Sequence, residues 1–160
     1  MPRPGPALAS EHRASGVPRH VLRVALPRVT ERLALMLTGA RTDAPRWDAL
    51  EWKVARAVAV IHGISPLLSG RMASFGAPGW RDFLEEQRTH TANRYRRMAS
   101  LLQTVDREAR AADISFVPLK GFALHALGLY SPGDRPMADL DLLVHPPDLV
   151  PMTQLIMRFG

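Results

Sequence analysis

Cysteine is absent from the 160 residues of the chain. Its absence excludes disulfide bridges, thiolate metal sites and a cysteine nucleophile. Long apolar runs are also absent, and none approaches the roughly 20 residues that a membrane-spanning helix needs. The nearest candidate for a signal sequence, residues 21–26, is interrupted by Arg23. We therefore expect a soluble, cytoplasmic protein with no membrane partner.

Acidic residues are few beside the basic ones, 15 against 21, so the formal net charge is +6. The positive charge lies in residues 1–110, because residues 111–160 carry three basic and five acidic side chains. A basic balance promotes non-specific association with nucleic acid, but it does not indicate a fold. A basic helical protein that binds nucleic acid therefore stays open as an alternative, and it is not the favoured one.

The length favours one domain, since domains usually run to roughly 100–200 residues. Residues 1–26 are predicted to form a flexible basic tail, because the first twenty are rich in Pro and Gly and hold almost no large apolar side chain. A helical region is predicted over residues 27–112. Residues 113–160 are predicted to form an α/β unit.

Apolar residues at helical spacing predict four helices in the middle region. The first begins at Pro27 and ends at Gly39, and the second leads from Trp47 to Gly63. The third covers residues 66–75, and the longest covers residues 79–112. The arginines of the longest helix fall mostly off its narrow apolar stripe, which indicates a solvated face.

The periodicity changes at Asp113. Residues 114–118 are β-branched and aromatic and predict a strand. A short helix follows Lys120 and Gly121, residues 137–144 predict a second strand, and residues 146–159 predict a last helix. The expected class is α+β, with a helical N-terminal region followed by a strand–helix–strand–helix unit.

Asp139 and Asp141 stand out within the second predicted strand. Residues i and i+2 of a strand project on one face, so both carboxylates should point the same way. Like charges so placed repel each other, and a divalent cation such as Mg²⁺ between them would remove that repulsion. The alternative is a half-exposed edge strand that shows two aspartates to water.

Two further features of the sequence indicate a site that binds phosphate. Lys120 and Gly121 stand at a predicted strand-to-helix junction, where free N–H groups and a partial positive charge favour an anion. Glycine there allows close approach to the backbone, and Lys120 adds a cation. Arg135, four residues before Asp139, is a second candidate contact for a phosphate or carboxylate.

These residues lie in two ordered runs, V-P-L-K-G-F-A-L at residues 117–124 and R-P-M-A-D-L-D-L-L-V at residues 135–144. Both runs, at this separation, resemble the signature of the uncharacterised nucleotidyltransferase family, a member of the DNA polymerase β-like nucleotidyltransferase superfamily. The resemblance extends over about residues 45–160.

The resemblance implies a small mixed sheet flanked by helices, with Asp139 and Asp141 as ligands of Mg²⁺ (or Mn²⁺) and Gly121 as the glycine of a phosphate loop. It implies transfer of a nucleoside monophosphate from an NTP such as ATP, with release of pyrophosphate. The acceptor stays open between a small molecule, a protein side chain and RNA.

The superfamily site also uses a third carboxylate from a later strand. After Asp141 the chain offers only Asp148, which we interpret as an N-cap or first-turn acid of the last helix. The α/β unit is therefore expected to be incomplete, with the chain ending where the next strand would begin. This leaves open the alternative of a non-catalytic nucleotide-binding remnant.

Overall fold

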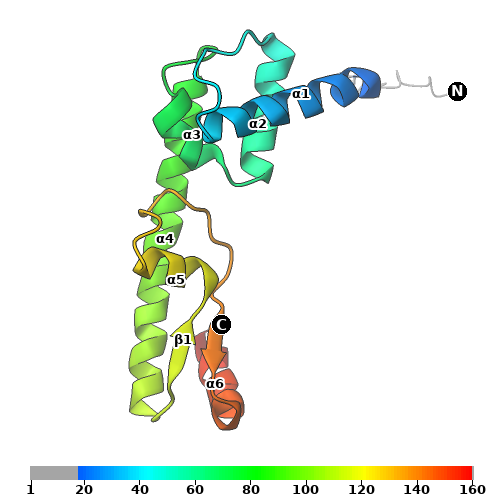
Figure 1. Cartoon of the computed structure of the whole chain (residues 1–160). Helices are drawn as coiled ribbons and strands as arrows, with labels where there is room; N and C mark the ends of the chain where they lie inside the picture. The colour runs from blue at the N-terminus through cyan, green and yellow to red at the C-terminus, as the bar shows by residue number, and fades with distance from the viewer. Residues whose placement is uncertain (1–17, 160) are drawn as a thin grey trace, which may run out of the picture.

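The longest helix, α4 (Trp80–Ala111), connects the two ends of the molecule, and α1 projects sideways near its N-terminal end (Figure 1). A computed structural model describes residues 18–159. Around the N-terminal part of α4 gather three helices, α1 (Arg19–Leu37), α2 (Ala49–Ile61) and α3 (Ser65–Met72). Along the rest lie β1 (Phe116–Pro118), α5 (Lys120–Ala126), β2 (Leu142–Val144) and α6 (Leu149–Ile156), with 3₁₀ turns at Pro146–Asp148 and Met157–Phe159. The expected α+β class is confirmed.

The predicted start of the first helix at Pro27 is wrong, because α1 begins at Arg19. The buried stripe of α1 begins at Ala25, two residues before the proline, and continues through Val29, Leu33 and Met36 in the core. Pro27 lacks an N–H group, so the bond to the carbonyl of Arg23 is missing, yet the helix passes through. Residues 19–26 of the expected tail are thus helical, and residues 1–17 lie outside the described part of the chain.

A reciprocal pair of hydrogen bonds begins α2. The carboxylate of Asp48 accepts from the backbone N–H of Glu51 at 2.8 Å, and the carboxylate of Glu51 accepts from the N–H of Asp48 at 3.0 Å. This capping box satisfies two donors that the helix leaves free. Arg28 of α1 pairs with Glu51 at 2.9 Å, so the same carboxylate joins α1 to α2.

Two separate hydrophobic cores share α4. The first is formed by α1, α2, α3 and the start of α4, where Trp80 is 1% exposed and its ring lies 5.1 Å from that of Trp52. The second is formed by the end of α4, by Ile114 and by α6, with Leu142 and Val144 of β2 packed against it. The middle of α4 belongs to neither core.

The second strand is shorter than predicted. β1 and β2 pair antiparallel with Pro118 opposite Leu142, and the last backbone bond runs from Leu119 N–H to the carbonyl of Asp141 at 2.8 Å. Because α5 begins at Lys120, β1 offers no partner to residues before Asp141. Residues 137–141 therefore lie outside the strand, which is a correction to the predicted strand over residues 137–144.

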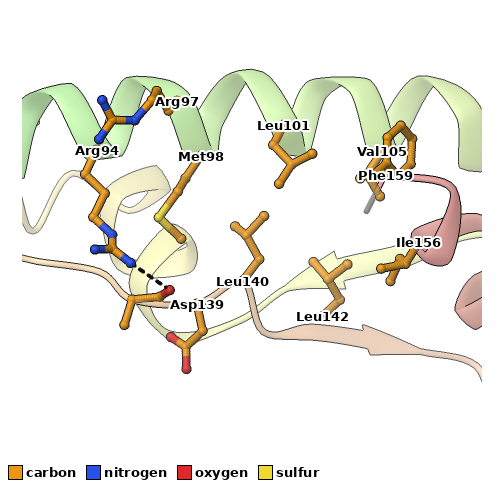
Figure 2. A pocket seen from close by; sticks show the side chains of 11 residues that line it. Arg94, Arg97, Met98, Leu101, Val105, Asp139, Leu140, Leu142, Ile156 and Phe159 are labelled. Atoms are coloured by element: carbon orange, nitrogen blue, oxygen red, sulfur yellow. Dashed lines mark hydrogen bonds between the residues drawn. The ribbon is translucent and has the colours of Figure 1, made fainter.

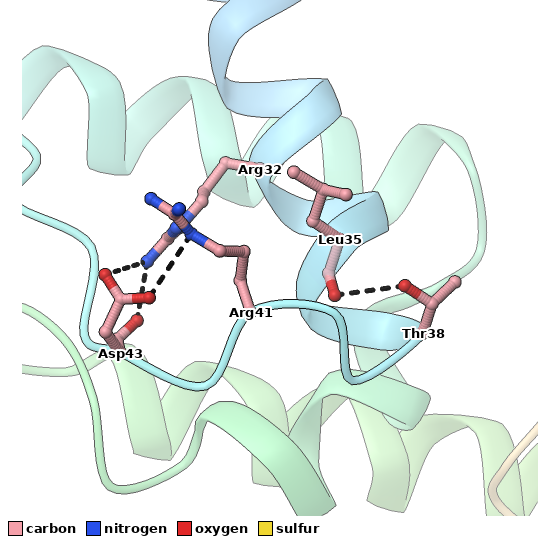
Figure 3. Close-up of polar contacts among 5 residues, drawn as sticks. All are labelled: Arg32, Leu35, Thr38, Arg41 and Asp43. Carbon is pink, nitrogen blue, oxygen red and sulfur yellow. Dashed lines mark hydrogen bonds and ion pairs between the residues drawn. The ribbon is translucent and has the colours of Figure 1, made fainter.

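Acidic residues hold several arginines of the helical region. Figure 3 shows Arg32 and Arg41 both directed at Asp43, at 2.7 Å and 3.3 Å. The hydrogen bond from Arg32 lowers the pKa of the Asp43 carboxyl, and the charges of both arginines act in the same direction. The predicted solvated face of α4 is confirmed by the exposed Arg107 and Arg110, which pair with neighbouring carboxylates.

None of the helices within residues 18–159 is long and apolar enough to cross a membrane.

Candidate functional site

Lys120 and Asp141 form an ion pair at the junction between β1 and α5. Lys120 is the first residue of α5, as the predicted strand-to-helix junction requires, and its Nζ donates to Oδ1 of Asp141 at 2.9 Å. The hydrogen bond and the charge of Asp141 raise the pKa of the Lys120 ammonium, and the charge of Asp139 raises it further. Lys120 thus lies within the field of both aspartates.

Asp139 and Asp141 project away from the second core. In Figure 2 Leu140 and Leu142 point toward α4, while the carboxylate of Asp139 points to the opposite side. Leu142 packs against the second core, whereas Asp139 is exposed and Asp141 is bonded to Lys120. The alternation expected of an extended chain therefore holds here, although this segment is not paired as a strand.

Lys120 adopts a left-handed backbone conformation, with a φ of 48°. For a residue with a Cβ this conformation costs roughly 1–2 kcal/mol, and it accompanies the contact between the Lys120 side chain and Asp141. Strain of this kind is often found where a side chain is held for a function.

Glycine and alanine at position 120 should separate this strain from the ion pair. Both variants lose the ammonium, but only glycine relieves the backbone, so Lys120→Gly should be more stable than Lys120→Ala by about 0.5–1 kcal/mol in urea unfolding. The matched control is Lys53, exposed inside α2, where alanine should be the more stable by about 1 kcal/mol. If glycine and alanine had the same order of stability at positions 120 and 53, the result would contradict backbone strain at Lys120.

Gly121 is in close contact with Met137. A Cβ at Gly121 would collide with Sδ of Met137 and would lie 2.9 Å from its Cγ, and Met137 is buried. This packing explains the glycine without a ligand, because the space that a side chain would take is filled by Met137. The role of Gly121 toward a phosphate stays a prediction.

Gly121→Ala should lower the free energy of unfolding by about 1–3 kcal/mol, because the added methyl group overpacks a buried contact. Met137→Ala removes the atoms in the way, so Gly121→Ala should cost less in the Met137→Ala background than in the wild type. Gly70 of α3 is the control, because a Cβ there meets nothing within 4 Å, and Gly70→Ala should stabilise the helix by about 0.5–1 kcal/mol. Thermal and urea unfolding measure all four proteins.

Arg135 is held apart from the aspartates. Its guanidinium lies over the ring of Tyr130, 5.6 Å from the centroid, and within residues 18–159 it forms no ion pair. Tyr130 in turn accepts, through its backbone carbonyl, from Nδ1 of His125 at 2.9 Å when that nitrogen carries the proton. The structure therefore brings together Lys120, Asp139 and Asp141 and leaves Arg135 outside this group.

Arg94 of α4 is a neighbour of the site that the sequence does not indicate. Its Nη2 donates to the carbonyl of Ala138 at 3.1 Å and so fixes the backbone next to Asp139 (Figure 2). Beside it a pocket of about 540 Å³ opens between α4, α6 and the segment before β2. Its walls are mostly apolar, with Leu101, Leu140 and Leu142 among them. The carboxylate of Asp139 points away from this pocket.

The donor set around Asp139 holds two carboxylates. Among residues 18–159 no three His, Cys, Asp or Glu side chains come together in a way that could hold a metal ion. Asp148 occupies the N-cap position of α6, as expected, but its side chain makes no capping hydrogen bond. Magnesium is commonly bound by one or two carboxylates together with substrate phosphates, so Asp139 and Asp141 fit that mode. The cation now beside Asp141 is the ammonium of Lys120.

A family model described as "Uncharacterised nucleotidyltransferase" matches residues 48–160. Neither curated proteins nor solved structures gave a match. The matched range covers more than half of the chain, and it includes Lys120 and both aspartates of the site. The matched range also agrees with the resemblance seen in the sequence, which extends over about residues 45–160 and depends on the motifs around Lys120 and Asp139. The chain therefore belongs to the uncharacterised nucleotidyltransferase family.

Proposed function

We propose that the protein transfers a nucleoside monophosphate from an NTP to an acceptor, with the group formed by Lys120, Asp139 and Asp141 as its reaction site. The observation that carries the proposal is the meeting of these three charged side chains on one exposed side of the chain, at the start of α5. Family membership supports nucleotidyl transfer as the general activity.

Asp139 and Asp141 would hold Mg²⁺ or Mn²⁺ together with the phosphates of the NTP. When bound, the metal would neutralise phosphate charge and stabilise the attacking and leaving oxygens of an in-line displacement. Asp141 can take this part because the side chain of its present partner, Lys120, is 68% exposed, and a lysine ammonium sits on a four-carbon stem that can turn away. The two carboxylates alone repel each other, which favours a bound cation between them.

Lys120 would bind the triphosphate. Once Asp141 turns to the metal, the released ammonium can donate to a phosphate oxygen, because a lysine side chain is long and carries three donors. The free N–H groups at the start of α5 add to the same positive field. Arg135 lies 15 residues along the chain from Lys120, and it would need to leave Tyr130 to reach the phosphates.

Positioning and charge neutralisation would do most of the catalysis. Arg94 contributes by fixing the carbonyl of Ala138, which limits the movement of Asp139. The acceptor is a hydroxyl or a phosphate group, and ATP is the first NTP to test. The cytoplasmic location expected from the sequence stays a prediction.

Pyrophosphate release tests this function directly. The protein is incubated with each of the four NTPs, with Mg²⁺ or Mn²⁺, and with an acceptor panel that includes small hydroxyl compounds, RNA and the protein itself. We expect release with at least one combination, and its loss when the metal is chelated. Release that continues unchanged in chelator would contradict a role for metal at Asp139 and Asp141.

The meeting of only two carboxylates within the described residues favours a second candidate, nucleotide binding without transfer. In that case calorimetry detects metal-dependent binding of an NTP, and no acceptor in the panel gives pyrophosphate. Binding that is the same in the wild type and in Asp141→Asn contradicts both candidates, because each assigns the metal to this carboxylate.

A further inference from the structure

A second, polar pocket lies on the side of α4 where the helical region meets the segment before β2. Its volume is about 460 Å³. The pocket is bounded by the end of α2, the start of α3, the middle of α4 and Pro136. Gly63 and Pro136 come close here, since a Cβ at Gly63 would lie 3.6 Å from Cγ of Pro136.

The charged side chains of this pocket are all basic. Arg94 and Arg97 come from successive turns of α4, and His90 precedes them by one turn. One N–H group of Arg94 donates to the carbonyl of Ala138, whereas Arg97 forms no ion pair within residues 18–159. No aspartate or glutamate lines the pocket, so nothing in its wall compensates these cations.

Ser65 supplies a buried donor without a partner. The side chain lines the pocket, the residue is 2% exposed, and its Oγ has no hydrogen-bond partner in the part of the chain that the structure describes. A buried hydroxyl that stays unpaired destabilises a fold, and such groups are usually explained by a ligand or a water molecule. Thr91, also buried, adds a second hydroxyl to the lining.

The start of α3 adds to the positive field. Ser65 is the first residue of this eight-residue helix, and the N-cap residue, Ile64, makes no side-chain capping hydrogen bond. Pro66 has no N–H group and the N–H of Leu67 donates to the carbonyl of Ile64 at 3.1 Å, so the N–H of Ser65 and the helix dipole are what this end offers to an anion. Together with Arg97 and the unpaired hydroxyl of Ser65, the wall therefore presents donors to an anion from two helices.

We propose that this pocket binds the phosphate group of a small phosphorylated molecule. Two guanidinium groups, hydroxyls and a helix start suit the several oxygens of a phosphate. The volume exceeds what a phosphate alone fills, so the organic part of the ligand has room beside it. The proposal does not rest on the reaction proposed at Lys120, Asp139 and Asp141, because none of these three residues lines the pocket. The two sites share Arg94, which lines the pocket and also donates to the carbonyl of Ala138.

Calorimetry with inorganic phosphate and with glycerol 3-phosphate tests the proposal, at low ionic strength and with chelator present. Arg97→Gln should weaken the binding of both probes at least about tenfold, since a charge-assisted hydrogen bond is lost. Arg107→Gln is the matched control, because Arg107 lies on the same helix, pairs with Glu108 and is not part of the pocket. Equal affinity in Arg97→Gln and in the wild type overturns the proposal, as does undetectable binding to the wild type.

Three further binding measurements identify the chemical group that the pocket binds. Ser65→Ala removes the unpaired hydroxyl without adding bulk, and it should weaken phosphate several-fold while the thermal midpoint stays at or above that of the wild type. Acetate should bind at least tenfold more weakly than phosphate, and equal binding overturns the assignment to phosphate. Asp139→Asn should leave metal-free phosphate binding unchanged, which separates this pocket from the proposed reaction site.

Discussion

Asp139→Asn is expected to lower the rate of pyrophosphate release at least about 100-fold, because the amide keeps the size of the side chain and removes the charge that would hold the metal. Its free energy of unfolding should stay within about 0.5 kcal/mol of the wild type, since the side chain is exposed and makes no hydrogen bond among the described residues. Steady-state rates and urea unfolding of the same preparation give both quantities.

Asp106→Asn serves as the control for this comparison. Asp106 is an aspartate on α4 that pairs with Arg110 at 2.8 Å, and it lines neither pocket beside the reaction site. Its activity should equal that of the wild type. A rate for Asp139→Asn within threefold of that control would refute the role of Asp139, whatever its stability.

Trp80→Ala is expected to lower the free energy of unfolding by about 3–5 kcal/mol, the range found when a large buried aromatic side chain is removed. Trp80 is almost fully buried, its ring packs against those of Trp52 and Phe83, and a Cβ at Gly76 would lie within 2.8 Å of it. Domains are usually stable by about 5–15 kcal/mol, so a large share of the stability is at stake. Chemical unfolding monitored by circular dichroism measures the loss.

Trp80→Phe should cost no more than about 1.5 kcal/mol. Phenylalanine keeps most of the apolar volume, and it removes Nε1 of Trp80, a buried donor with no hydrogen-bond partner among the described residues. Losing an unpaired donor offsets part of the lost packing. A larger loss for phenylalanine than for alanine would contradict this account of the core.

The features that depend on local pattern could be predicted from the sequence. Helices α2, α3 and α4 lie within a few residues of the predicted ranges, because apolar spacing and terminal glycines are local signals. The opposite orientation of Asp139 and Leu140 could be predicted too, since it requires only an extended chain. The start of α5 at Lys120 could be predicted as well, because the strand pattern of residues 114–118 gives way to a helical pattern after Lys120 and Gly121.

The features that depend on tertiary partners could not be predicted. Whether residues 137–141 join a ladder is decided by where the opposite strand turns into α5, and nothing within those residues indicates it. The early start of α1 depends on the burial of Ala25 against other helices, which outweighs the cost of Pro27. The contacts of Arg94 with Ala138 and of Gly121 with Met137 join residues distant in sequence, and their residue types alone do not single them out.

The sharing of α4 between two cores has a consequence for cooperativity. Trp80 and Leu84 belong to one core and Val105 and Ala109 to the other, while the turns between them have few buried side chains. Segments with little buried apolar contact open locally at a lower free energy than the cores beside them. The chain is thus expected to behave as two folding units that meet in the middle turns of one helix. Those turns carry Arg94 and Arg97, so a ligand held there would tie the opening of one unit to that of the other.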